Sequence, residues 1–84
     1  MTSLRSKKFT IRWKEQGHNA CVNATVIAPT EKDALIKLRD SLLLNCGIGY
    51  NYLWIIRVST DEYSTLYVKK VNDVIDIIDN QKMF

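Results

Sequence analysis

The chain has few of the residues on which most catalytic and metal sites depend. Its 84 residues include one histidine, two cysteines, one proline and three glycines. A tetrahedral zinc site built from Cys and His needs four donors, whereas Cys21, Cys46 and His18 supply three. The segment Gly47–Gly49 lacks the third glycine and the Lys-Ser/Thr pair of a phosphate-binding loop. We therefore expect no catalytic residue, no metal and no cofactor, and a protein that is not an enzyme.

Cys21 or Cys46 together with His18 is the only pairing in the chain that could generate a thiolate nucleophile, and His18 precedes Cys21 by three positions. No third group is placed to orient such a pair, so we interpret His18 as an exposed loop residue beside a thiol. The aspartates at 73, 76 and 79 are spaced along one helical face, and we interpret them as the solvated side of an amphipathic helix.

Long apolar runs are also missing. No stretch approaches the roughly 20 apolar residues that a membrane-spanning helix requires. The first eight residues are basic and polar, unlike the apolar core of a secretory signal. These features predict a cytoplasmic protein without a membrane partner, and reduced thiols at both cysteines.

The composition is that of one globular domain over residues 1–84, with 46% hydrophobic and 25% charged residues. The net charge of +3 is unevenly distributed along the chain. Five cations precede the first acid, Glu15: Arg5, Lys7, Lys8, Arg12 and Lys14. We expect residues 1–6 to form a flexible basic arm and residues 80–84 to fray.

The first half of the chain has clear local signals. Residues 8–15 and 20–28 alternate between apolar and polar side chains, which predicts two antiparallel strands joined by a hairpin loop. Pro29 ends the second strand, and Thr30 with Asp33 resembles a capping box at a helix start. Leucines at 35, 38 and 42 form the apolar face of this helix, and Gly47 is placed to end it.

The second half repeats the same order of elements. Residues 52–60 and 63–70 have strand composition, and Asn72 is placed to cap a final helix with apolar residues at 71, 74, 75 and 78. The predicted fold is α+β with the order β-β-α-β-β-α. It has two layers: a four-stranded antiparallel sheet with both helices on one face. The predicted core consists of Phe9, Ile11, Trp13, Val22, Val26, Leu35, Leu38, Leu42, Trp54, Ile56, Leu66, Val68, Val74 and Ile78.

Two surfaces of this predicted fold could bind a partner. Alternation leaves several apolar side chains outside the core, and they predict a protein-binding surface formed by Ile36, Leu43, Leu53 and Ile55. A homodimer through the open sheet face or an exposed strand edge would also cover apolar surface. Cations and a tyrosine on the open sheet face suggest nucleic-acid binding as the alternative, through Arg12, Lys14, Arg57, Tyr67 and Lys69 together with the basic arm.

The segment Ala24–Ala34 resembles a strand-to-capped-helix junction found in many small phage and mobile-element proteins. This resemblance implies no residue role. Together with the small size and the missing catalytic motifs, it favours a non-enzymatic accessory or inhibitor protein that acts sterically on a protein partner.

Overall fold

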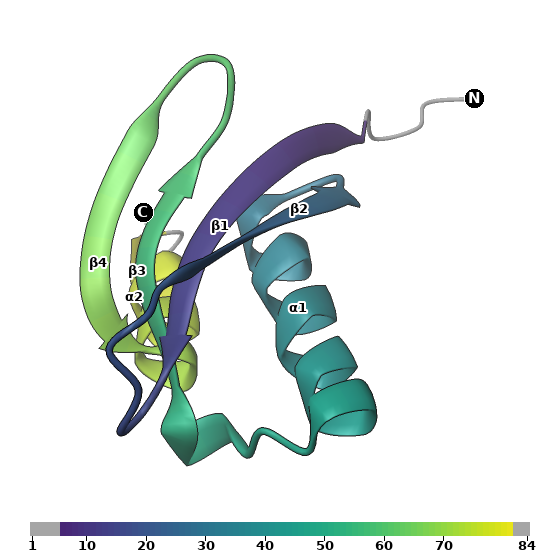
Figure 1. The fold of residues 1–84 in the computed structure, drawn as a ribbon. Helices are drawn as coiled ribbons and strands as arrows, with labels where there is room; N and C mark the ends of the chain where they lie inside the picture. Colours follow the sequence, from purple (N-terminus) through teal and green to yellow (C-terminus); the bar gives the residue numbers. More distant parts are fainter. Residues whose placement is uncertain (1–5, 82–84) are drawn as a thin grey trace.

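The computed structural model describes residues 6–81, and its element order is the predicted β-β-α-β-β-α (Figure 1). The elements are β1 (Lys7–Glu15), β2 (Val22–Ala28), α1 (Glu31–Cys46), a 3-10 turn η1 (Tyr50–Tyr52), β3 (Leu53–Ser59), β4 (Ser64–Lys70) and α2 (Val71–Gln81). Most of the predicted basic arm and residues 82–84 lie outside the described residues, and α2 is assigned through Gln81.

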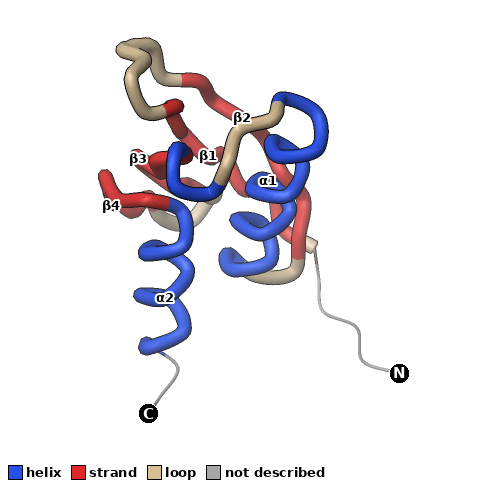
Figure 2. Tube along the Cα trace, turned by 90° about the horizontal axis from the view of Figure 1, so that it is seen from below, coloured by secondary structure: helices blue, strands red, loops and turns tan. Residues whose placement is uncertain are grey.

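The four strands form one antiparallel sheet in the order β2-β1-β3-β4. β1 and β3 are central, while β2 and β4 are the two edges. Figure 2 shows both helices on the same side of the sheet, α1 below β2 and α2 below β4. The opposite face of the sheet, called the outer face below, carries no helix formed by residues 6–81.

Local sequence determines where α1 begins and ends. The Thr30 hydroxyl accepts a hydrogen bond from the Asp33 amide at 3.1 Å, which confirms the predicted N-cap. Gly47 has a φ of 69°, and its amide donates to the carbonyl of Leu43, a left-handed end that glycine adopts without steric cost. The predicted cap at Asn72 is wrong, because α2 begins directly at Val71 after β4. Asn72 instead accepts a hydrogen bond from the Arg39 guanidinium of α1 at 3.0 Å.

A bulge in β3 reverses half of the predicted sheet faces. β1 residue Trp13 pairs with Ile55, but the preceding Arg12 pairs with Arg57, so Ile56 has no partner on β1. One extra residue changes which side chains face the helices. Leu53, Ile55 and Val58 therefore lie together in the core, although period-two alternation would place Val58 opposite the other two.

The faces of β4 are also the reverse of those predicted, and its pairing with β3 is interrupted by a register shift. Val68 has a φ of 51°, a left-handed conformation that is unusual for a β-branched residue. Leu66 and Val68, which were predicted to be buried, are 59% and 49% exposed. Tyr67, predicted to face solvent, packs partly against the core instead.

The core lies between the sheet and the two helices. It comprises Phe9, Ile11, Ala28, Ala34, Leu35, Leu38, Leu42, Ile48, Leu53, Ile55, Val58, Val71, Val74, Ile75 and Ile78. The predicted core positions on β1, α1 and α2 are confirmed, except that Trp13 is only partly buried. On β2, Val26 is partly buried and Val22 is 45% exposed. Trp54 and Ile56, also predicted in the core, are only partly buried. Because of the bulge, Leu53 and Ile55 face the helices instead of them.

Candidate functional site

The outer face of the sheet is organised in rows of paired residues. One row joins Asn23, Arg12, Arg57 and Leu66 across all four strands. The next row joins Lys14, Trp54 and Lys70. Paired residues of an antiparallel sheet share a face, and rows two residues apart are separated by about 7 Å. Arginines, lysines and a tryptophan therefore lie close together on a face without a helix.

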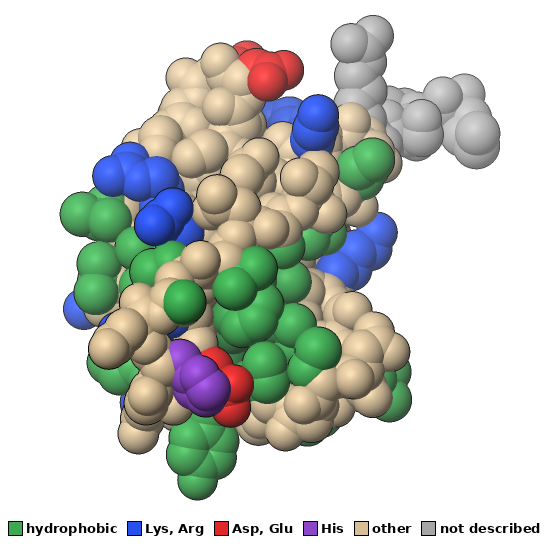
Figure 3. Space-filling view, viewed as in Figure 1, with side chains coloured by type: hydrophobic (Ala, Val, Ile, Leu, Met, Phe, Trp, Pro, Cys, Tyr) green, Lys and Arg blue, Asp and Glu red, His purple; other side chains and the backbone are tan. Residues whose placement is uncertain are grey.

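The strand residues of this face carry cations and no carboxylates. Five positions are basic: Lys8, Arg12, Lys14, Arg57 and Lys70. In Figure 3, which shows the molecule with α2 behind β3, red carboxylates appear at only two places, the β3–β4 turn and beside the histidine. Blue and green side chains alternate over β4 on the left of that view. The face therefore combines positive charge with apolar surface.

These cations have no carboxylate partner in the described part of the chain. The ion pairs there join Lys32 to Asp79 at 2.9 Å and Arg39 to Asp40 at 3.1 Å, and His18 lies 3.5 Å from Glu15. Arg57 donates to the Ser64 hydroxyl at 2.8 Å, a neutral partner that orients the guanidinium without cancelling its charge. A row of unneutralised cations attracts polyanions and repels other cations.

Trp54 is the aromatic residue of this face. Its Nε1 donates to the Gln16 side-chain oxygen at 3.3 Å, which ties the indole to the end of the β1–β2 hairpin. The side chain is half-buried, so part of the ring remains accessible between Lys14 and Lys70. An accessible aromatic ring between cations provides a stacking surface next to phosphate-binding groups.

Three predicted nucleic-acid residues lie on the outer face, and two do not. Arg12, Lys14 and Arg57 are there as predicted. Lys69 pairs with Ile55, a residue that faces the helices, so the lysine of the outer face is Lys70. Tyr67 turns toward the helices and donates to the Glu31 carboxylate. Alternation missed Trp54 because it does not register the bulge at Ile56, and it missed Lys70 because the two faces of β4 were predicted the wrong way round.

The predicted protein-binding surface is not a single surface in the structure. Leu53 and Ile55 are 1% and 0% exposed, so their predicted exposure is wrong. Ile36 packs partly against the core because α1 lies close to the sheet. Leu43 alone among the four is exposed, beside a cavity of about 440 Å³ that is also lined by Tyr50, Tyr52 and Asn72.

A cluster on the helix side explains the position of Tyr67. The hydroxyls of Tyr63, at 3.0 Å, and Tyr67 both donate to the Glu31 carboxylate at the start of α1. Partial burial, followed by the hydrogen bond to Glu31, raises the pKa of Tyr63 to about 12. The same causes raise the pKa of Tyr67 further above its ordinary value. The cluster links β4 to α1, and we assign it a structural role.

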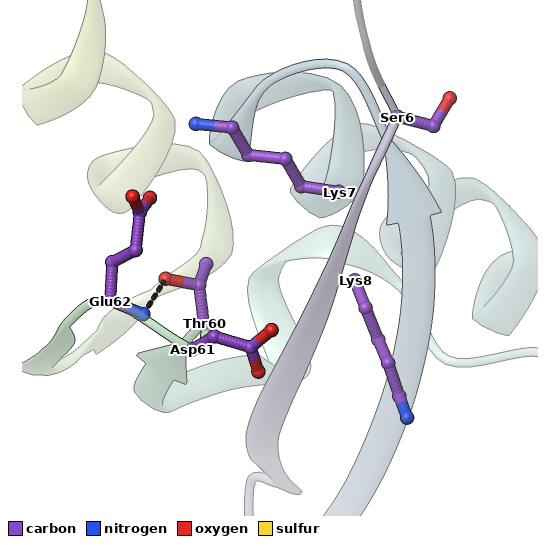
Figure 4. A pocket seen from close by; sticks show the side chains of 6 residues that line it. All are labelled: Ser6, Lys7, Lys8, Thr60, Asp61 and Glu62. Atoms are coloured by element: carbon purple, nitrogen blue, oxygen red, sulfur yellow. Dashed lines mark hydrogen bonds between the residues drawn. The ribbon is translucent and has the colours of Figure 1, made fainter.

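A shallow cavity of about 390 Å³ lies between the start of β1 and the β3–β4 turn (Figure 4). Lys7 and Lys8 leave β1 on opposite sides, and Asp61 and Glu62 come from the turn. The Glu62 amide donates to the Thr60 hydroxyl at 3.1 Å, which fixes the turn. This cavity holds both signs of charge and marks the end of the outer face.

The described residues, 6–81, also bear on metal binding and on membrane insertion. That part of the chain brings no three His, Cys, Asp or Glu side chains together in a way that could hold a metal ion. None of its helices has the length and apolar character needed to cross a membrane. Comparison of the chain with protein-family models, with curated proteins and with solved structures gave no match.

Proposed function

We propose that this protein binds single-stranded nucleic acid through the outer face of its sheet. The observation that carries the proposal is the carboxylate-free strand surface on which Trp54 lies between Lys14 and Lys70, next to the Arg12–Arg57 row. Cations that lack carboxylate partners can contact phosphates without first breaking an ion pair. An accessible indole can stack on an unpaired base, at about 1–3 kcal/mol per base.

A single strand fits this face better than a duplex. The bases of a duplex are already stacked on each other, so Trp54 would find no free base face there. The helix side is less suited to phosphates than the sheet, because α2 presents Asp73 and Asp76 to solvent and these would repel them. The proposal therefore predicts a preference for single strands and one bound orientation.

The test is fluorescence anisotropy with labelled single-stranded RNA, single-stranded DNA and duplex DNA over a range of salt. Each phosphate neutralised contributes about −0.7 to the slope of log affinity against log salt for single strands, so four to five contacts give a slope of about −3. Trp54→Ala should weaken single-strand binding by about 1–3 kcal/mol, and Trp54→Phe should retain most of the affinity.

Neighbouring lysines of β4 supply a matched control. Lys70 pairs with Trp54 on the outer face, whereas Lys69 pairs with the helix-facing Ile55. Lys70→Ala should reduce the salt slope by about 0.7, and Lys69→Ala should leave it close to the wild-type value. No binding at low salt would overturn the proposal. Equal binding to duplex with no effect of Trp54→Ala would remove the stacking mechanism.

A protein partner is the second candidate, and one observation favours it. Leu43 is 42% exposed beside the cavity formed with Tyr50 and Tyr52, and the adjacent Leu44 is 85% exposed. An accessory or inhibitor protein could act sterically through this surface at the end of α1. A defined partner that stays bound after nuclease treatment and is lost on Leu43→Glu, but not on Trp54→Ala, would support this function over the first.

A further inference from the structure

The two edges of the sheet differ in how well they are protected from pairing with another strand. The β4 edge carries Lys69 and Lys70 and is interrupted by the left-handed Val68. Within β2 itself there is neither device: its sequence VNATVIA contains no charge and no proline, and its pairing with β1 shows no register shift. The one cation at this edge is Lys37 of α1, which reaches a single carbonyl, that of Ile27. Proteins usually block edge strands with lysine, proline or bulges, so an unblocked regular edge is a pairing surface.

Two hydrogen bonds show which β2 peptide groups point to the open edge. The Lys37 ammonium of α1 donates to the Ile27 carbonyl at 2.9 Å, so that carbonyl points to the open edge, where it already accepts one hydrogen bond. On the other side of β1, the Gln16 amide donates to Tyr52 at the start of β3. Even-numbered β1 residues thus bond toward β3 and odd-numbered ones toward β2, where they pair with even-numbered residues.

It follows that Asn23, Thr25 and Ile27 direct both their amides and their carbonyls away from the sheet. This arrangement is symmetric about Thr25. A second copy in antiparallel orientation would place its Thr25 opposite Thr25 and its Ile27 opposite Asn23. The three opposed pairs would form about six backbone hydrogen bonds, each pair exchanging two, and the Ile27 carbonyl of each copy would accept the strand amide in addition to, or in place of, Lys37.

The surroundings of the β2 edge suit a second copy of the chain. Ile27 is 60% exposed and Val22 45% exposed at the two ends of β2. A cavity of about 400 Å³ lies between β2 and α1, next to Lys37 and Ser41. Leu44 follows these residues on the same side of α1, at i+7 and i+3. In this register Ile27 would lie opposite Asn23 of the other copy, and no charged strand residue would face its own copy.

We propose that two copies join through their β2 edges into one eight-stranded sheet with a two-fold axis at Thr25. The axis is perpendicular to the sheet, so both outer faces lie on the same side and form one continuous surface. The occupant of the edge is a second copy because the outward peptide groups complement themselves about Thr25. The inference does not depend on nucleic acid and is tested without it.

The first experiment compares two threonines that pair with each other. Thr25 and Thr10 are both exposed on the outer face and form one register pair, but only Thr25 lies at the edge. Thr25→Lys would place two like charges directly opposite each other at the axis. By analytical ultracentrifugation without nucleic acid, we expect a concentration-dependent wild-type dimer. We expect about tenfold or weaker dimerisation for Thr25→Lys and wild-type behaviour for Thr10→Lys.

The second experiment uses a crosslink that reports the register. A directly opposed hydrogen-bonded pair has Cα atoms about 5.5 Å apart, which is within disulfide range. In a chain with Cys21→Ser and Cys46→Ser, the variant Thr25→Cys should form a disulfide dimer on oxidation, and Thr10→Cys should not. A wild-type chain that stays monomeric up to millimolar concentration would overturn the proposal. A dimer that is unaffected by Thr25→Lys, or that gives no crosslink at Thr25, would also overturn it.

Discussion

The left-handed backbone at Val68 can be tested by comparing a glycine with an alanine variant, because it should reverse their usual order of stability in a strand. In an ordinary strand position, glycine is less stabilising than alanine by about 0.5–1 kcal/mol because it loses more conformational freedom on folding. At a φ of 51°, alanine keeps the steric conflict of its Cβ, which costs about 1–2 kcal/mol, whereas glycine has none. Val68→Gly should therefore be more stable than Val68→Ala by about 0.5–1 kcal/mol.

Leu66 is the control position, because it lies on the same strand and is similarly exposed, at 59% against 49% for Val68. Both variants at each position remove the side chain, so the lost packing cancels when glycine is compared with alanine. Leu66→Gly should be less stable than Leu66→Ala by about 0.5–1 kcal/mol. The two comparisons thus differ by about 1–2 kcal/mol in total.

Urea unfolding followed by circular dichroism measures all four variants, with thermal melts as a check. For a domain of this size, 1 kcal/mol corresponds to about 4–8 °C in Tm. If glycine is the worse residue at both positions, Val68 does not hold a strained conformation, and the account of the β4 faces fails. If the order reverses only at Val68, the interruption of β4 is confirmed.

Two further predictions concern the core and the tyrosine cluster. Ile55→Ala should reduce the free energy of unfolding by about 2–5 kcal/mol, because Ile55 is fully buried, and a loss below about 0.5 kcal/mol in urea unfolding would contradict its place in the core. Because folding raises the pKa of Tyr63 from 10.0 to about 12, folding favours its neutral form. That contribution is complete below pH 10 and is lost as the pH rises toward 12. Glu31→Gln should move the tyrosinate absorbance titration to lower pH, and an unchanged titration would contradict the role of Glu31.

The first half of the fold could be predicted because each boundary has its own chemical signal. Pro29 cannot donate to a strand ladder, Thr30 caps the helix, and Gly47 adopts the left-handed end. The faces of β1 follow simple alternation, with Phe9 and Ile11 buried. Here the local preferences and the tertiary contacts agree.

The second half could not be predicted from alternation, and the reason is local. Residues 52–56 are apolar on both sides of the strand, so period two offers two faces of similar hydrophobicity. The choice depends on the bulge at Ile56, which no glycine or proline indicates in the sequence. The sequence does not indicate the left-handed conformation of Val68 either, because a β-branched residue favours an extended strand conformation.

The mispredicted strand faces affect only some residues of the candidate site. Arg12 and Lys14 were predicted correctly because β1 is regular, and Arg57 because the bulge precedes it. Trp54 was missed because it lies before the bulge, where the predicted faces of β3 are reversed, and Lys70 because the predicted faces of β4 are reversed. Charge was thus a better guide than periodicity, since a cation remains exposed in either register.

The separation of charge between the two layers determines which charge a nucleic-acid strand would display once such molecules covered it. The outer face is cationic, while α2 presents Asp73 and Asp76 to solvent on the other side of the molecule. A nucleic-acid strand covered by such molecules would still display negative charge on its outside. Neighbouring covered strands would continue to repel each other, so coating would protect the bases without causing the strands to bundle.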